Sequence, residues 1–253
     1  MSVPVIARVA VVPQPPLLVP ELVVGQDPDV RTVREECLAV AAQLVRAAPR
    51  WVAIAADELA SPDVERPTTV GPRAVGTFRG YGVDVPVRLS ADDTGGSDPD
   101  PSMPLPALIA GWLREQAGAA EVRVLMVPPT LPAADCQALG ERLGGELSTD
   151  EPVGLLVIGD GSHRHGERAV GRPDGRAAGF DEDVRRALAD ADADALRKLD
   201  GGLAESLGVV GRAPWQILSG VVGKDGRAWR CVHSRLLIPF GVAYHLALWD
   251  PVE

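Results

Sequence analysis

The sequence predicts an α/β protein, a three-layer sandwich in which a largely parallel central sheet is flanked by helices. Short apolar runs alternate along the chain with longer segments in which apolar residues recur every three or four positions. The chain has 253 residues, of which 46% are hydrophobic, and this is enough apolar side chain for a buried core. We expect residues 1–253 to form one domain.

The first elements are marked by their start and stop signals. The β-branched run at 5–12 predicts a buried strand that Pro13 ends, and the proline-rich "PQPPLLVPEL" is not expected to form regular structure. Asp27 is the expected N-cap of an amphipathic helix, with Pro28 at its first position. The apolar residues 51–56 follow as a second strand.

Strands and helices alternate again after a glycine- and proline-rich passage that extends to about residue 103. We expect a short strand at 83–89 in that passage, and then helices and strands up to a closing antiparallel hairpin. The predicted elements are helix 104–118, strand 121–127, helix 132–144, strand 153–159, one or two helices over 177–199, helix 214–222, and strands 228–236 and 240–249.

Composition excludes several classes of function. A formal charge of −10 with only 4% aromatic residues argues against nucleic acid as a partner. The chain has no apolar run of about 18 residues and no signal peptide, so we expect a cytoplasmic protein without membrane contact. The three cysteines, Cys37, Cys136 and Cys231, lie far apart and are predicted to be buried thiols rather than disulfides or metal ligands.

Polar residues follow three of the predicted strands. Gln14 comes after the first strand, Asp57 after the second, and Asp160, Ser162, His163 and His165 after the strand at 153–159. In open α/β sheets, ligands bind outside the carboxyl ends of the strands, so one pocket is expected to collect these side chains. The alternative is that they only fill turns, cap a helix and lie in solvent.

Three sequence blocks carry a family resemblance. "VPQPPLLVPEL", "IGDGSHRHGERAVGRPDGRAAGFDEDV" and "IPFGVAYHLALW" resemble the LigB-type class III extradiol ring-cleavage dioxygenases, a superfamily that includes the Memo-like proteins. The resemblance implies an α/β sandwich and a non-haem iron(II) held by two histidines and a glutamate. It also implies that His163, in the Ser-His-Arg motif, is the counterpart of the family's acid/base histidine.

The positions that correspond to the iron ligands are all changed. Gln14 stands where the family has its first histidine, Asp57 where it has the second, and Val209 or Val210 where it has the carboxylate. An amide, one carboxylate and a valine do not form the two-histidine, one-carboxylate face that iron(II) needs for oxygen chemistry. We therefore expect no metal and no cofactor.

Three hypotheses follow from the sequence. The first is a small-molecule binding protein or non-oxidative acid/base enzyme, in which His163 exchanges a proton with a polar or aromatic ligand and Asp57 or Asp160 orients it. The second is an active dioxygenase whose iron(II) is bound by His165, His233, His245 or an acidic residue. The third is a non-enzymatic scaffold for a protein partner. A homo-oligomer is compatible with all three.

Other conspicuous residues are predicted to be structural. His233 and His245 alternate with apolar residues on strands, which favours satisfied core histidines. Trp112, Trp215 and Trp249 are expected in the core. The charged pattern at 183–199 predicts a solvated helix face with capping carboxylates.

Overall fold

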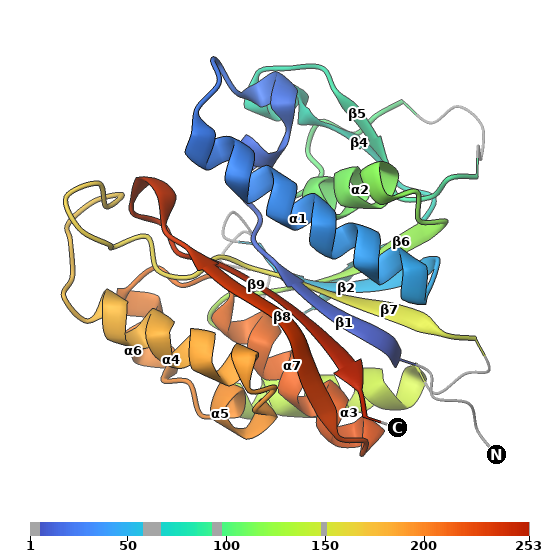
Figure 1. Ribbon diagram of the computed structural model, residues 1–253. Helices are drawn as coiled ribbons and strands as arrows, with labels where there is room; N and C mark the ends of the chain where they lie inside the picture. Colours follow the sequence, from blue (N-terminus) through green and yellow to red (C-terminus); the bar gives the residue numbers. More distant parts are fainter. Residues whose placement is uncertain (1–5, 58–66, 93–97, 148–150, 253) are drawn as a thin grey trace.

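The computed structural model describes residues 6–57, 67–92, 98–147 and 151–252 (Figure 1). At their centre lies a seven-stranded sheet with the strand order β3-β6-β2-β7-β1-β9-β8. The pairs β6–β2, β2–β7 and β7–β1 are parallel, whereas β3, β9 and β8 pair antiparallel at the two sides of this parallel centre. The predicted α/β class with a largely parallel sheet is therefore confirmed.

The central strands β1, β2 and β7 are mostly apolar and buried, as is usual for parallel strands covered by helices, whereas the edge strands β3 and β8 are partly exposed. β4 (Val75–Thr77) and β5 (Pro86–Arg88) form a separate two-stranded ribbon, and β5 is the short strand expected in the middle passage. The strands of the large sheet are β1 (Ile6–Val12), β2 (Arg50–Ala56), β3 (Thr68–Val70), β6 (Glu121–Val127), β7 (Val153–Ile158), β8 (Trp229–Leu237) and β9 (Tyr244–Pro251).

The helices begin close to the predicted positions. α1 (Pro28–Ala47) starts as expected, because the Asp27 carboxylate accepts a hydrogen bond from the backbone N–H of Asp29 and Pro28 occupies the first helical position. The other α-helices are α2 (Leu105–Ala117), α3 (Ala133–Glu146), α4 (Ala177–Ala189), α5 (Ala193–Arg197), α6 (Gly201–Ser206) and α7 (Arg212–Asp225). Four 3-10 helices are η1 (Pro16–Leu18), η2 (Pro20–Leu22), η3 (Phe78–Tyr81) and η4 (Pro239–Gly241).

The proline-rich segment after β1 is more regular than predicted. It forms the two single turns η1 and η2, each with a proline at its first position, where the missing backbone N–H costs no hydrogen bond. The segment 177–199 divides into α4 and α5 at Ala191, which has a positive φ of 51°. Part of the acidic passage 91–102 lies outside the described residues.

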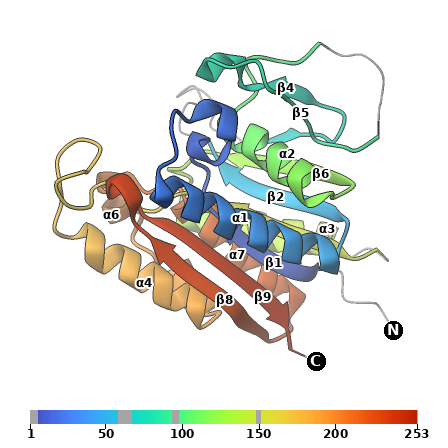
Figure 2. The same ribbon diagram turned by 45° about the horizontal axis from the view of Figure 1, so that its top comes forward.

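The helices cover both faces of the sheet (Figures 1 and 2). α1 and α2 lie on one face, where Trp112 is buried, and the remaining α-helices lie on the other, where Trp215 and Trp249 are buried. The core positions predicted for these three tryptophans are thus confirmed. Cys37 and Cys136 are buried as expected, but Cys231 is only partly buried, because it lies on β8 at the edge of the sheet.

The strand directions bring several chain segments to one edge of the sheet. β1, β2 and β7 are parallel and all end at this edge. β9 runs in the opposite direction beside β1, so its first residues, Tyr244 and His245, lie at the same edge. Within the described residues, no helix is both long and apolar enough to cross a membrane.

Candidate active site at the carboxyl edge of the sheet

Gln14, Asp57 and Asp160 meet where β1, β2 and β7 end. The backbone N–H of Gln14 donates to Oδ1 of Asp160 at 2.8 Å. The side-chain amide of Gln14 donates to the carbonyl of Ala56, the last residue of β2, at 3.5 Å. Asp57 follows directly, and its backbone N–H donates to the carbonyl of Val127 at the end of β6. The structure thus brings together three of the residues that the sequence placed after strand ends.

The Gln14 side chain has an acceptor without a donor. Gln14 is only 5% exposed, and its Oε1 atom is buried without a hydrogen-bond partner among the described residues. Leaving such a group unpaired costs about 1–3 kcal/mol. A ligand that donates a hydrogen bond at this place would recover that free energy.

Burial, with a smaller contribution from Asp57 or Asp160, raises the pKa of three neighbouring groups. Burial raises the pKa of the Tyr244 phenol, and the negative charge of Asp160 raises it further. Burial likewise raises the pKa of Tyr81, with an additional contribution from Asp57. The Cys37 thiol, buried under the same edge, also has a raised pKa, first because of burial and then because of Asp160. All three groups therefore stay protonated at neutral pH.

His163 lies in the loop that follows β7 and is oriented by a backbone carbonyl. Its Nδ1 is 2.9 Å from the carbonyl oxygen of Val170. A carbonyl only accepts, so in neutral His163 Nδ1 carries the proton and Nε2 keeps a lone pair. The orienting group is thus the Val170 carbonyl, whereas the sequence pointed to Asp57 or Asp160.

The Nε2 edge of His163 packs on Gly208. An added Cβ at Gly208 would lie only 1.8 Å from Nε2 of His163, and the φ of +66° at this glycine is one that L-residues rarely adopt. Three residues later, the backbone N–H of Gly211 donates to the carbonyl of Asp160 at 2.8 Å. The segment 208–211 therefore links His163 to the carboxyl edge of the sheet.

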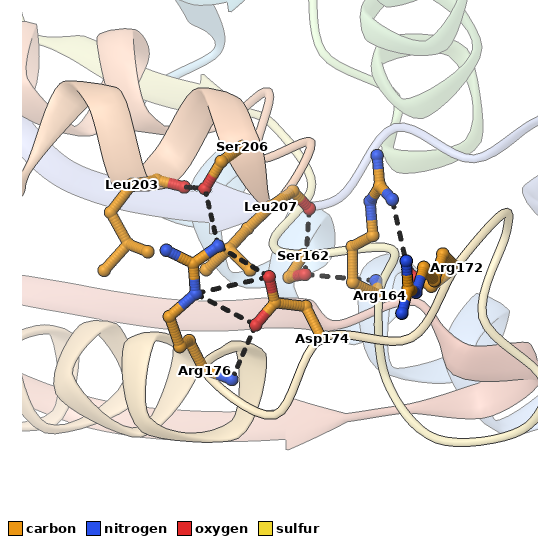
Figure 3. A network of polar contacts seen from close by, with 8 residues as sticks. All are labelled: Ser162, Arg164, Arg172, Asp174, Arg176, Leu203, Ser206 and Leu207. Carbon is orange, nitrogen blue, oxygen red and sulfur yellow. Dashed lines mark hydrogen bonds and ion pairs between the residues drawn. The ribbon is translucent and has the colours of Figure 1, made fainter.

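Ser162 holds this loop in place. Its side chain is fully buried, and its hydroxyl donates to the carbonyl of Leu207 at 2.9 Å and accepts from the backbone N–H of Arg164 at 3.1 Å (Figure 3). Both functions of the hydroxyl are thus used inside the protein. These contacts hold the loop, and a ligand contact of Ser162 stays a prediction.

His165 and His245 share one buried carboxylate. Nε2 of His165 is 2.6 Å from Oδ2 of Asp181, and Nε2 of His245 is 2.9 Å from Oδ1. Asp181 and His245 are both fully buried, and the backbone N–H of Ser162 also donates to the Asp181 carboxylate. This cluster ties the loop after β7 to α4 and β9. It gives His165 a partner inside the protein, although the sequence placed this residue among the ligand contacts.

Asp181 is the residue that the sequence reasoning missed. It stands at the start of the acidic run 181–183, whose charges are typical of a solvated helix face. Helical spacing, however, puts it between Ala177 and Val184, both of which are buried against the sheet. A carboxylate within an apolar stripe was the available signal for a buried, partnered acid.

His245 is buried as predicted but only half satisfied. Its Nδ1 atom has no hydrogen-bond partner among the described residues, and its ring packs edge-on against Trp215 with centroids 5.3 Å apart. His233 lies on β8 and pairs with Glu36 of α1 at 3.2 Å. It belongs to a different part of the sheet from the cluster around Asp181.

The described residues at the positions of the family's ligands do not form the iron(II) centre that the family resemblance implies. Val209 and Val210 are buried apolar residues and supply no ligand atom. His165 and His245, the histidines that could have replaced the missing ligands, both direct Nε2 at oxygens of Asp181. Within the described residues, no group of three or more histidine, cysteine, aspartate or glutamate side chains is arranged to hold a metal ion.

Comparisons with known proteins give likenesses to solved structures alone. No protein-family model and no curated protein matches the chain. Among solved structures, the chain is similar to an uncharacterized protein from Escherichia coli K12, with 12% sequence identity and a TM-score of 0.49 over 96% of this chain and 99% of that one. At this level of similarity the likeness carries no information on activity.

Proposed function

We propose that the protein binds a small polar or aromatic molecule at the carboxyl edge of the sheet and exchanges a proton with it through His163, without a resident iron centre. The observation that carries the proposal is the hydrogen bond from His163 Nδ1 to the carbonyl of Val170. It leaves Nε2 as the basic atom of a neutral imidazole whose orientation is fixed. A fixed ring with a lone pair on Nε2 is one feature that a general base requires; the second is reach to the ligand, and for this Nε2 would have to turn away from Gly208.

The surrounding residues fit a ligand with hydrogen-bonding groups. Oε1 of Gln14 is an unused acceptor for a ligand hydroxyl or amide. Asp57 and Asp160 add two carboxylates at the carboxyl edge of the sheet. Where such catalysis operates, a positioned base contributes about 10²–10⁴ in rate.

The proposal is tested by proton exchange rather than by a particular substrate. A library of small phenols, hydroxy acids and oxo acids is incubated with the protein in D₂O with EDTA, and binding and loss of carbon-bound proton signals are followed by NMR. We expect at least one compound to bind and exchange with wild type, and His163→Ala to slow its exchange by about 10²-fold or more. His233→Ala is the matched control, because His233 is paired with Glu36 away from this edge.

Two outcomes would contradict the proposal. Binding and exchange that are the same in wild type and His163→Ala would show that the histidine has no role in them. Oxygen uptake with catechols that depends on added iron(II) would support the dioxygenase hypothesis. If no compound binds wild type, the scaffold hypothesis gains support instead.

A further inference from the structure

The loop that carries His163 also carries an arginine without an ion pair. Arg176 pairs with Asp174 through its guanidinium at 2.6 Å. Arg164, in contrast, forms no ion pair among the described residues, and its only side-chain hydrogen bond is from Nη1 to the carbonyl of Arg172 at 3.2 Å. Figure 3 shows the Arg164 side chain pointing away from the Asp174–Arg176 pair. Arg164 and Arg176, two of the four arginines in the segment 160–176, therefore have different environments.

Several N–H donors of the Arg164 guanidinium have no acceptor among the described residues. Its Nε atom is buried and has no hydrogen-bond partner among the described residues. A guanidinium has five N–H donors, and a buried, charged donor without an acceptor costs free energy. No described carboxylate lies within ion-pair distance of Arg164, although its charge contributes to the lowered pKa of Asp174 in the same loop. Because Nε is buried, an acceptor from outside the chain would contact the Nη atoms of this partly exposed side chain.

The backbone of Arg164 is held in position. Its N–H donates to the hydroxyl of Ser162, and its carbonyl accepts from the backbone N–H of Asp174 at 3.1 Å. Ser162 is in turn fixed to the carbonyl of Leu207. A charged group on such a pre-organised backbone loses less entropy when a ligand binds.

The positive charge of Arg164 favours an anionic ligand. Asp57 and Asp160 place two carboxylates at the carboxyl edge of the sheet. Arg164 directly follows His163 and adds a positive charge on the loop side of the edge. A planar guanidinium binds the two oxygens of a carboxylate or phosphoryl group in parallel.

We propose that Arg164 binds an oxyanion group, carboxylate or phosphoryl, of the molecule on which His163 acts. This inference rests on the proposed function and narrows it to anionic ligands. The anionic end of the molecule contacts the loop after β7, and its hydrogen-bond donors contact Gln14 and Asp160. Ligands that lack the anion lose most of their affinity.

The test measures anion binding at Arg164 directly. The arginine Nε–H signals are recorded by ¹⁵N NMR while inorganic phosphate or benzoate is added, with benzamide as the uncharged counterpart of benzoate. The Arg164 signal is assigned by its loss in Arg164→Gln. We expect saturable shifts of this signal with one or both anions and none with benzamide, and the anion with the tighter binding identifies the group as carboxylate or phosphoryl.

Three variants make the result specific. Arg164→Gln should weaken anion binding, followed by backbone amide shifts, by about tenfold or more, the loss expected for a charged hydrogen bond. Arg164→Lys should retain weak binding, because it keeps the charge but loses the planar fork. Arg176→Gln is the matched control in the same loop and should bind the anions as wild type does. Thermal melts verify that each variant is folded.

The inference fails if neither anion shifts the Arg164 signal saturably, or if Arg164→Gln binds the anions as tightly as wild type. These failures are distinguishable from failure of the proposed function. An uncharged compound whose exchange depends on His163 but not on Arg164 would leave the proposed function standing and refute the inference. Anion binding at Arg164 without any exchange that depends on His163 would uphold the anion site and refute the acid/base role.

Discussion

Substitution of Gly208 should displace His163, and the structure gives the size of the effect. In Gly208→Ala, the new Cβ would lie 1.8 Å from Nε2, 2.1 Å from Cδ2 and 2.9 Å from Cε1 of the imidazole, so the ring has to move. The φ of +66° adds about 1–2 kcal/mol of backbone strain for any L-residue. Loss of the hydrogen bond to Val170 adds about 1 kcal/mol.

Gly226→Ala is the matched control. Gly226 has a similar φ of +74° as the C-cap of α7, but an added Cβ there meets nothing within 4 Å. It should therefore show the backbone strain alone. The difference of about 1 kcal/mol corresponds to a Tm about 2–4 °C lower for Gly208→Ala in a domain of this size.

The assay combines thermal unfolding with NMR of the His163 ring protons. We expect the ring signals to shift in Gly208→Ala and to stay unchanged in Gly226→Ala, with proton exchange impaired only in the first variant. Equal melting temperatures for the two variants, or unchanged His163 signals in Gly208→Ala, would refute the packing of the imidazole on Gly208.

Three further predictions concern the buried carboxylate, the loop ion pair and the metal. Asp181→Ala should destabilise the protein by about 3–5 kcal/mol in chemical denaturation, because it removes the partner of two imidazoles, whereas the exposed Asp183→Ala should change stability by no more than about 0.5 kcal/mol; equal effects would show that the cluster contributes nothing. Hydrogen bonds from Arg176 lower the pKa of Asp174 in the folded protein to about 2. Their stabilisation is therefore fully present above the pKa of Asp174 in the unfolded chain, and it is lost as the pH falls through the folded pKa of about 2. Arg176→Gln should return the Asp174 pKa towards about 3.9 in an NMR titration, and an unchanged pKa would contradict the pairing. Protein purified without added metal should contain far less iron than one atom per chain by elemental analysis; stoichiometric iron that survives dialysis would overturn this expectation.

Local signals in the sequence determined most of the fold. The short apolar runs of β1, β2 and β7 and the alternating pattern of β6 predicted strands, and Asp27 with Pro28 predicted the start of α1. These signals work because they depend on residues that are neighbours in the chain. The same reasoning placed Gln14, Asp57 and Asp160 at one edge, since residues that follow parallel strands share an edge of the sheet.

Only the tertiary structure decided which polar groups are paired with one another. Asp181 contacts His165 across 16 residues and His245 across 64, and no local pattern encodes contacts over such distances. The Val170 carbonyl that orients His163 and the glycine on which the imidazole packs are likewise set by the path of the loop. The sequence by itself thus determined where the candidate site lies. The folded chain decided which of its side chains are held by the protein and which keep an unused donor or acceptor, because these pairings depend on distances that exist only after folding.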